Sequence, residues 1–234
     1  MGIFIVRYVI HACLDRMWYV DEYLIPSMLE QGIDRDDILL WCDTEKKGCL
    51  ISAIECFEHC GQYEGGCWHL QDDIILAKDF AKRTRSANDR IECGFCHSLF
   101  EKNNGRSVDR IGQVKAQYMW SSFPCIYIPN RLAAEFAEWY YSKASFQDRY
   151  QMMISDKKGD DMFWRDFVNE VHPEEIVFNH TPSLIDHIDW LIGGSVANRL
   201  RGTNCRSYYW EDEDMIEALR NRLCKEGHKS SVLF

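Results

Sequence analysis

Two adjacent aspartates, Asp72 and Asp73, interrupt an apolar stretch of the chain at residues 68–76, WHLQDDIIL, where Gln71 precedes them. Carboxylates between buried segments cost free energy unless they have a partner. Proteins hold Mg²⁺ and Mn²⁺ with one or two carboxylates, together with substrate phosphates and water. The pair therefore predicts a divalent metal held against a diphosphate, with Asp73 as the direct ligand and Asp72 beside it. A solvated turn after a strand is the alternative.

A second acidic pair, Asp160 and Asp161, begins an apolar helical pattern, DDMFWRDFVNEV. The helix dipole favours the anionic form of a carboxyl group at this position. A carboxylate held in this way can act as a general base, so both residues are candidates for one. An aspartate before an apolar helix is as often an N-cap, and the sequence leaves both roles open. Lys157 and Lys158 either face a diphosphate or lie in solvent.

The competing metal motif is the CGFC segment at 93–96, which His97 follows. A structural zinc site needs a second ligand pair at compatible spacing, and the spacing from Cys60 to Cys67 is poor. The 11 cysteines of the chain are spread over its length and lie mostly in apolar runs. This pattern favours buried free thiols over a zinc centre, a redox motif or a disulfide scaffold.

Apolar runs at 4–13, 36–43 and 67–70 predict strands, and helical spacing of apolar residues at 18–32 and 49–60 predicts helices between them. Pro26 should kink the first helix, and Gly32 should end it. This alternation is typical of an α/β fold with an open, mostly parallel sheet and helices on both faces. Ligands of such sheets bind beyond the carboxyl ends of the strands, which places the three strand ends at one ligand-binding edge.

Further strands are expected within 90–100 and 118–130, and helices at 131–144 and 160–171. The segment 178–202 is rich in turn residues and is predicted to be a loop. An acidic helix at 211–227 should end the chain. Since no repeat or low-complexity linker divides the sequence, we expect a single domain over 1–234.

The composition, with 46% hydrophobic and 13% aromatic residues, is that of a packed globular protein. A net charge of −10 argues against a general nucleic-acid binder, but residues 78–115 hold nine basic and five acidic side chains. A second basic stretch at 199–206 precedes Tyr208, Tyr209 and Trp210. The N-terminus lacks the features of a signal peptide, and no apolar run is long enough to span a membrane, so we expect a cytoplasmic protein without membrane contact.

The first strand, the second strand ending at Asp43, the helix after Gly48 and the HLQDDII segment together resemble the nucleotide-sugar half of a GT-A fold glycosyltransferase. The stretch MWSSFPCIYIPN at 119–130, followed by the helix pattern, resembles the acceptor side, and the whole is similar to small glycosyltransferases encoded by phages and prophages. In that family an Asp-x-Asp or x-Asp-Asp motif binds the metal that bridges the sugar diphosphate. Gln71 stands where many members carry an acid.

The resemblance implies a Rossmann-like GT-A domain in which residues 1–100 bind the nucleotide-sugar. Residues 101–234 would then supply the acceptor half and the C-terminal loop and helix. It also implies that His11, Ala12 and Cys13 lie against the base and ribose.

The same resemblance implies that Asp43 hydrogen-bonds the nucleoside and that Gly48 lets a helix start approach the donor. A turn residue and a helix entry are the alternatives for these two positions. The PSLIDH segment at 182–187 resembles the loop whose histidine reaches back to the metal or diphosphate, which makes His187 the second candidate ligand. A packed histidine is the alternative there.

The implied function is a metal-dependent hexosyltransferase that moves a sugar from a UDP-sugar to a hydroxyl, with Mn²⁺ or Mg²⁺ as cofactor. The basic stretches at 78–115 and 199–206 favour a 5-hydroxymethylpyrimidine base in phage DNA as acceptor. A glycan or small-molecule acceptor is the alternative within this class. A nucleotidyltransferase and a non-catalytic binding protein are the alternatives outside it.

Overall fold

The computed structural model describes residues 7–88, 97–98, 110–115, 125–143, 160–181 and 184–188, together with 217 and 221. The CGFC segment at 93–96, Lys157, Lys158 and the basic stretch 199–206 lie outside the described residues. Of the expected terminal helix, only Glu217 and Asn221 are described, and both are helical.

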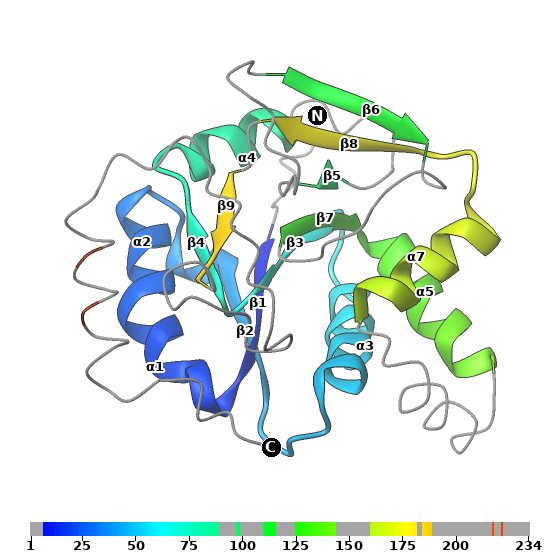
Figure 1. Ribbon diagram of the computed structural model, residues 1–234, viewed down its shortest axis with the longest axis horizontal. Coiled ribbons are helices and arrows are strands. Elements are labelled where there is room, and N and C mark those ends of the chain that lie inside the picture. Colours follow the sequence, from blue (N-terminus) through cyan, green and yellow to red (C-terminus); the bar gives the residue numbers. More distant parts are fainter. Residues whose placement is uncertain are drawn as a thin grey trace.

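The core of the fold is a seven-stranded sheet in the order β2-β1-β3-β7-β5-β8-β6 (Figure 1). The three strands that the N-terminal pattern predicted, β2, β1 and β3, pair in parallel. Strand β7 is antiparallel to both β3 and β5, β8 is parallel to β5, and β6 is antiparallel to β8. The strands are β1 (Arg7–Cys13), β2 (Ile38–Asp43), β3 (Gly66–Gln71), β5 (His97–Ser98), β6 (Arg110–Lys115), β7 (Cys125–Pro129) and β8 (Ile176–Thr181).

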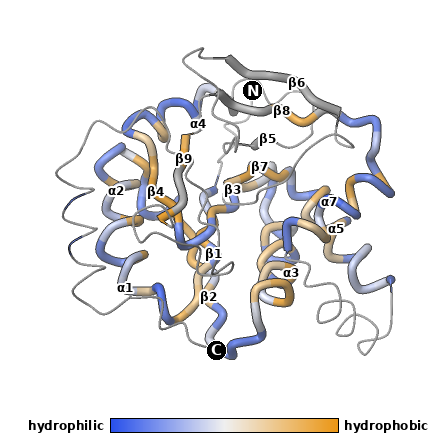
Figure 2. Tube along the Cα trace, in the orientation of Figure 1, coloured by the Kyte–Doolittle hydropathy of each residue, from blue (hydrophilic) through white to orange (hydrophobic). Residues whose placement is uncertain are grey.

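Helices cover both faces of this sheet, as the alternating pattern predicted. Successive residues of β1 point to opposite faces, so Tyr8 and Ile10 join one buried cluster and Val9 the other. In Figure 2 apolar residues are concentrated on these central strands, while α4 is largely hydrophilic. One face packs on α1 (Met17–Tyr19), η2 (Val20–Leu24), α2 (Ile25–Glu30) and α4 (Phe80–Asn88), and the other on α3 (Cys49–Cys60), α5 (Asn130–Ser142) and α7 (Asp160–Val171). The predicted α/β class is confirmed.

The helical region around Pro26 consists of several short segments, whereas the sequence predicted one helix with a kink. A π-helical segment, Val20–Leu24, stands before α2, and Pro26 lies in the first turn of α2. Leu24 and Ile25 keep helical backbone angles, so the π-helical turn passes directly into α2, and a π-turn is one of the local changes that accompany a bend in a helix. Gly32 follows α2 with a φ of 76°, which glycine adopts without strain, so the predicted helix end is confirmed.

The prediction of a loop over 178–202 is wrong for the part that the structure describes. Strand β8 begins before this segment and pairs on both sides, and β9 (Ile185–His187) forms a two-stranded antiparallel sheet with β4 (Ile74–Leu76). Both strands are short and Pro182 stands between them, so no periodic pattern is visible in the sequence. Their hydrogen-bond partners lie far away in the chain.

The parallel register brings the candidate site residues to one edge of the sheet. Cys13 at the end of β1 pairs with Asp43 at the end of β2, and His11 pairs with Gln71 at the end of β3. The turn that contains Asp72 and Asp73 follows directly. The carboxyl ends of the three strands therefore lie at one edge of the sheet, which is the edge that the sequence pattern predicted.

Candidate functional site

The carboxylate of Asp72 is fully engaged by the protein itself. Its Oδ2 accepts the backbone N–H of Cys13 at 2.7 Å, and its Oδ1 accepts the Arg16 Nε–H at 2.6 Å. Burial raises the pKa of Asp72, and the Arg16 guanidinium and the Cys13 N–H oppose that rise. Asp72 thus ties the turn after β3 to the end of β1.

Arg16 lies in the short 3₁₀ segment η1 (Leu14–Arg16), immediately after β1. Burial lowers its pKa, but the carboxylates of Asp73 and Asp72 raise it by more, so the guanidinium stays charged. The two acids of the turn after β3 therefore lie close to one fixed cation, which η1 supplies. Sequence analysis missed Arg16, although a cation three residues beyond a buried strand was a visible signal.

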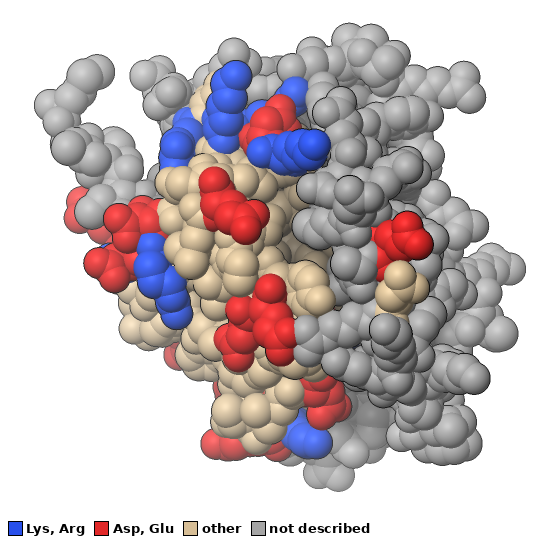
Figure 3. All heavy atoms as spheres, turned by 90° about the vertical axis from the view of Figure 1, so that its left-hand side faces the viewer, with Lys and Arg blue, Asp and Glu red and all other residues tan. Residues whose placement is uncertain are grey.

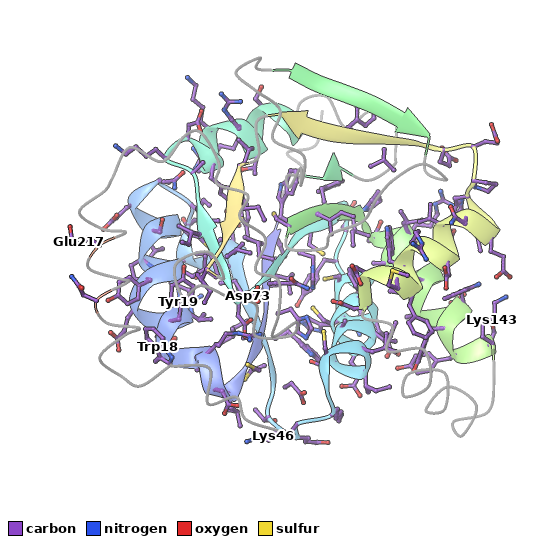
Figure 4. All side chains as sticks on the ribbon, in the orientation of Figure 1. Trp18, Tyr19, Lys46, Asp73, Lys143 and Glu217 are labelled. Atoms are coloured by element: carbon purple, nitrogen blue, oxygen red, sulfur yellow. The ribbon has the colours of Figure 1, made fainter. Side chains whose placement is uncertain are left out.

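Asp73 occupies the second position of the turn between β3 and β4 and is half-buried. Its backbone carbonyl accepts the N–H of Ile188 at 2.9 Å. Its charge raises the pKa of Arg16 and of Tyr19, whose pKa burial also raises. Figure 4 shows Asp73 in the middle of the molecule with Tyr19 on its α1 side.

The segment that ends in His187 lies beside this turn, because β9 pairs with β4. In the β4–β9 pairing, the Cα of His187 lies opposite that of Ile74, the residue after Asp73. The imidazole of His187 lies outside the described side chains, so its contact with a metal or diphosphate stays a prediction.

Asp160 begins α7, and only 5% of it is exposed. Its Oδ2 accepts a hydrogen bond from Gln71 Nε2 at 3.2 Å, and the Cys49 thiol is a second hydrogen-bond partner. Burial, helped by the neighbouring Asp161, raises the pKa of Asp160 to about 6. A carboxylate with that pKa can accept a proton efficiently near neutral pH. Asp161 is only half-buried, so Asp160 is the stronger candidate of the pair.

The three residues at the end of β1 differ in what they offer to a ligand. His11 Nε2 is 2.8 Å from the Ser52 hydroxyl, and burial lowers the pKa of His11 to about 4. Ala12 is buried in the core. Cys13 is half-buried, and its N–H is bound by Asp72. A base or ribose at this edge would meet Cys13 before the side chains of the other two.

Asp43 and Gly48 shape the loop between β2 and α3. The Asp43 carboxylate accepts the backbone N–H groups of Lys47 at 2.9 Å and Gly48 at 3.0 Å. Gly48 has a φ of 92°, and a Cβ placed on it would meet nothing within 4 Å. Backbone conformation, not crowding, therefore calls for glycine here. The loop-closing role of Asp43 is observed, and its contact with a nucleoside stays a prediction.

A divalent cation at this edge would need oxygen ligands from both the protein and a substrate. Within the described residues, no group of three or more His, Cys, Asp or Glu is arranged to hold a metal ion. Asp72 uses both oxygens within the protein, which leaves Asp73 as the candidate carboxylate ligand. Mg²⁺ commonly binds through one or two carboxylates and takes its remaining oxygens from substrate phosphates and water. The described side chains thus offer Asp73 as one candidate ligand, and metal binding here stays a prediction.

Cys13 and Cys49 lie at this edge, and four other described cysteines are buried in the core. The buried Cys56, Cys60, Cys67 and Cys125 are free thiols, as predicted. Lys78, Lys82 and Arg85, which lie on or just before α4, are exposed, and Figure 3 shows a group of Lys and Arg side chains at the top of its face. On the same helix Thr84 bonds the hydroxyl of Tyr8, near the amino end of β1, at 2.8 Å. The α4 part of the basic stretch is therefore near the opposite end of β1 from Asp73.

No protein-family model and no curated protein sequence matches this chain. Among the helices that the structure describes, none has the length and apolar character needed to cross a bilayer.

Proposed function

We propose that this protein is a metal-dependent glycosyltransferase of the GT-A type, which transfers a sugar from a UDP-sugar to a hydroxyl. The observation that carries the proposal is the hydrogen bond that ties Asp160 to Gln71, the last residue of the strand that Asp73 follows. Asp73 lies two residues beyond Gln71, which is the last residue of β3. The Gln71 amide donates a hydrogen bond to the buried Asp160 of α7. A candidate metal ligand and a candidate base are thus anchored to the same strand end.

Asp73, with His187 as second ligand, would hold Mn²⁺ or Mg²⁺ against the diphosphate of the donor. When bound, the ion neutralises negative charge on the leaving diphosphate. Arg16, which is bonded to Asp72 and attracted by the charge of Asp73, would limit the repulsion between these carboxylates and the phosphates. The loop closed by Asp43, together with Cys13, would bind the nucleoside.

Asp160 would act as the base on the acceptor. The acceptor oxygen attacks the anomeric carbon, its proton passes to the Asp160 carboxylate, and the bond from that carbon to the diphosphate oxygen breaks. With a pKa of about 6, most Asp160 is ionised at roughly pH 7 and above. Burial excludes water from the carboxylate and strengthens its interaction with the hydroxyl.

The acceptor we propose to test first is 5-hydroxymethylpyrimidine in DNA. Its support is the exposed cationic set Lys78, Lys82 and Arg85, which suits phosphate contact. Tyr8 and Cys13 are five residues apart on β1, so a DNA strand bound to α4 would extend about 17 Å to reach the acidic edge. A glycan or a small hydroxyl compound needs no such reach and is the second acceptor class.

The test is a panel of nucleotide-sugars with Mn²⁺, read by nucleotide release with and without hydroxymethylated DNA. Asp73→Ala should abolish Mn²⁺-dependent donor binding and leave the fold intact by circular dichroism. Asp21→Ala, an exposed aspartate on η2, is the matched control. Undiminished UDP-sugar binding by Asp73→Ala would place the site elsewhere. Thermal stabilisation by nucleoside triphosphates alone would point to a nucleotidyltransferase.

A further inference from the structure

Gln71 links the last position of β3 to the first turn of α7. Its Cα is paired with His11 of β1, so the parallel sheet fixes its backbone. Its side-chain amide leaves the strand end and donates to Asp160 Oδ2 at 3.2 Å, across 89 positions of sequence. The amide therefore faces the candidate base, although Gln71 lies within the segment that suggested a metal motif.

The surroundings of Asp160 make this one contact consequential. The groups that act on its carboxylate are Gln71 from β3, Cys49 and more remotely Cys56 from α3, and Asp161 from its own helix. The desolvation of a carboxylate that is 5% exposed favours the neutral acid, and the charge of Asp161 acts in the same direction. Hydrogen bonds from the Asp161 backbone N–H, the Cys49 thiol and the Gln71 amide favour the charged form and oppose both effects.

We propose that Gln71 is a positioning residue for the base: its amide fixes Asp160 Oδ2 and favours the ionised carboxylate over the neutral acid. This inference rests on the proposed function for its catalytic meaning. A glutamine suits the position because it is uncharged and can donate. A carboxylate at position 71 would face the Asp160 carboxylate and repel it.

The first experiment follows the titration of Asp160 by carbon-13 NMR in protein labelled at the aspartate carboxyl groups, with Asp160→Asn to identify the resonance. Gln71→Met removes the donor at similar volume and should move the midpoint upward by about one pH unit. Gln71→Glu adds a like charge and should move it further in the same direction. Unchanged midpoints in both variants would overturn the inference.

The control is Gln31→Met. Gln31 donates to the Ala77 carbonyl at 2.9 Å and accepts the Ala81 N–H at 3.1 Å, so its amide has a purely structural role beneath α4. This variant should lose thermal stability and keep the Asp160 midpoint of the wild type. A midpoint that moved equally in Gln31→Met would show that loss of stability, not the Gln71 contact, causes the shift.

The second experiment measures kcat/KM for nucleotide release against pH. Gln71→Met should shift the acid limb upward by about one pH unit, so its rate near pH 6 falls several-fold while its rate at high pH stays close to wild type. An acid limb that does not move overturns the positioning role even if the NMR midpoint moves. If the wild-type protein releases no nucleotide from any nucleotide-sugar, the proposed function is wrong. The NMR titration still decides whether Gln71 shifts the titration midpoint of Asp160.

Discussion

The Arg16 guanidinium is bonded to Asp72 Oδ1 through both Nε and Nη2, each at 2.6 Å. The other oxygen of Asp72 binds the Cys13 N–H. These contacts distinguish the two adjacent aspartates. Asp72 holds the end of β1 against the turn after β3, whereas Asp73 is the candidate metal ligand.

The first prediction separates these tasks by stability. Asp72→Ala leaves Arg16 without its principal hydrogen-bond partner and the Cys13 N–H without its acceptor. Removing one member of a largely buried ion pair is costly, so we expect the free energy of unfolding to fall by about 2 to 4 kcal/mol. Urea unfolding measures this. Asp73→Ala removes an attraction to Arg16 but leaves the Asp72 hydrogen bonds to Arg16 and Cys13 in place, so we expect a smaller loss than for Asp72→Ala. Equal losses in the two variants would contradict the division.

The second prediction concerns a conflict between stability and activity at Asp160. Its folded pKa of about 6 lies above the ordinary value of 3.8, so folding favours the protonated acid and stability is lost as pH rises through this window. Asp160→Asn removes the charge and can still accept the Gln71 hydrogen bond. We expect it to be more stable than wild type near pH 8, by up to about 3 kcal/mol, and to lose transfer activity. Thermal unfolding at roughly pH 4 and pH 8 checks the sign, since the gain should vanish at the lower pH.

The third prediction uses the opposite shift at His11. Its folded pKa of about 4 lies below the ordinary value of 6.5, so the unfolded chain binds the proton more readily. The stability contribution is complete above pH 6.5 and is lost as pH falls towards 4, by about 3 kcal/mol in total. His11→Gln cannot take up this proton. The stability difference between His11→Gln and wild type should therefore shrink as pH falls, and a constant difference would argue against a buried neutral imidazole.

The fourth prediction tests the loop after β2. Gly48 has a φ of 92° and a ψ of 161°, a region that is essentially restricted to glycine. Gly48→Ala should cost about 1 to 3 kcal/mol of stability through backbone strain, because the space around the added methyl is open. If the Asp43 loop binds the nucleoside, UDP affinity measured by calorimetry should fall as well. Unchanged stability would mean that the loop relaxes without loss.

Local patterns in the sequence were sufficient for the first half of the fold. Runs of apolar residues whose spacing repeats over a few positions predict β1, β2, β3 and α3. The parallel order of the three strands then places Asp43 and Asp73 at the same edge of the sheet. Strand β9 was not predictable in this way. Its three residues are too few to show a period, and its pairing with β4 spans more than 100 positions of sequence.

The sequence by itself determined which chemistry this chain could carry: an acidic pair after a buried strand, and a second acidic pair at a helix start. Residue types and short spacings are enough for that, because strand exits and helix starts are local features. Only the tertiary structure decided how the acids differ. Whether a carboxylate meets Arg16, Gln71 or a neighbouring acid depends on which distant elements pack against it, and that environment sets its charge and its role.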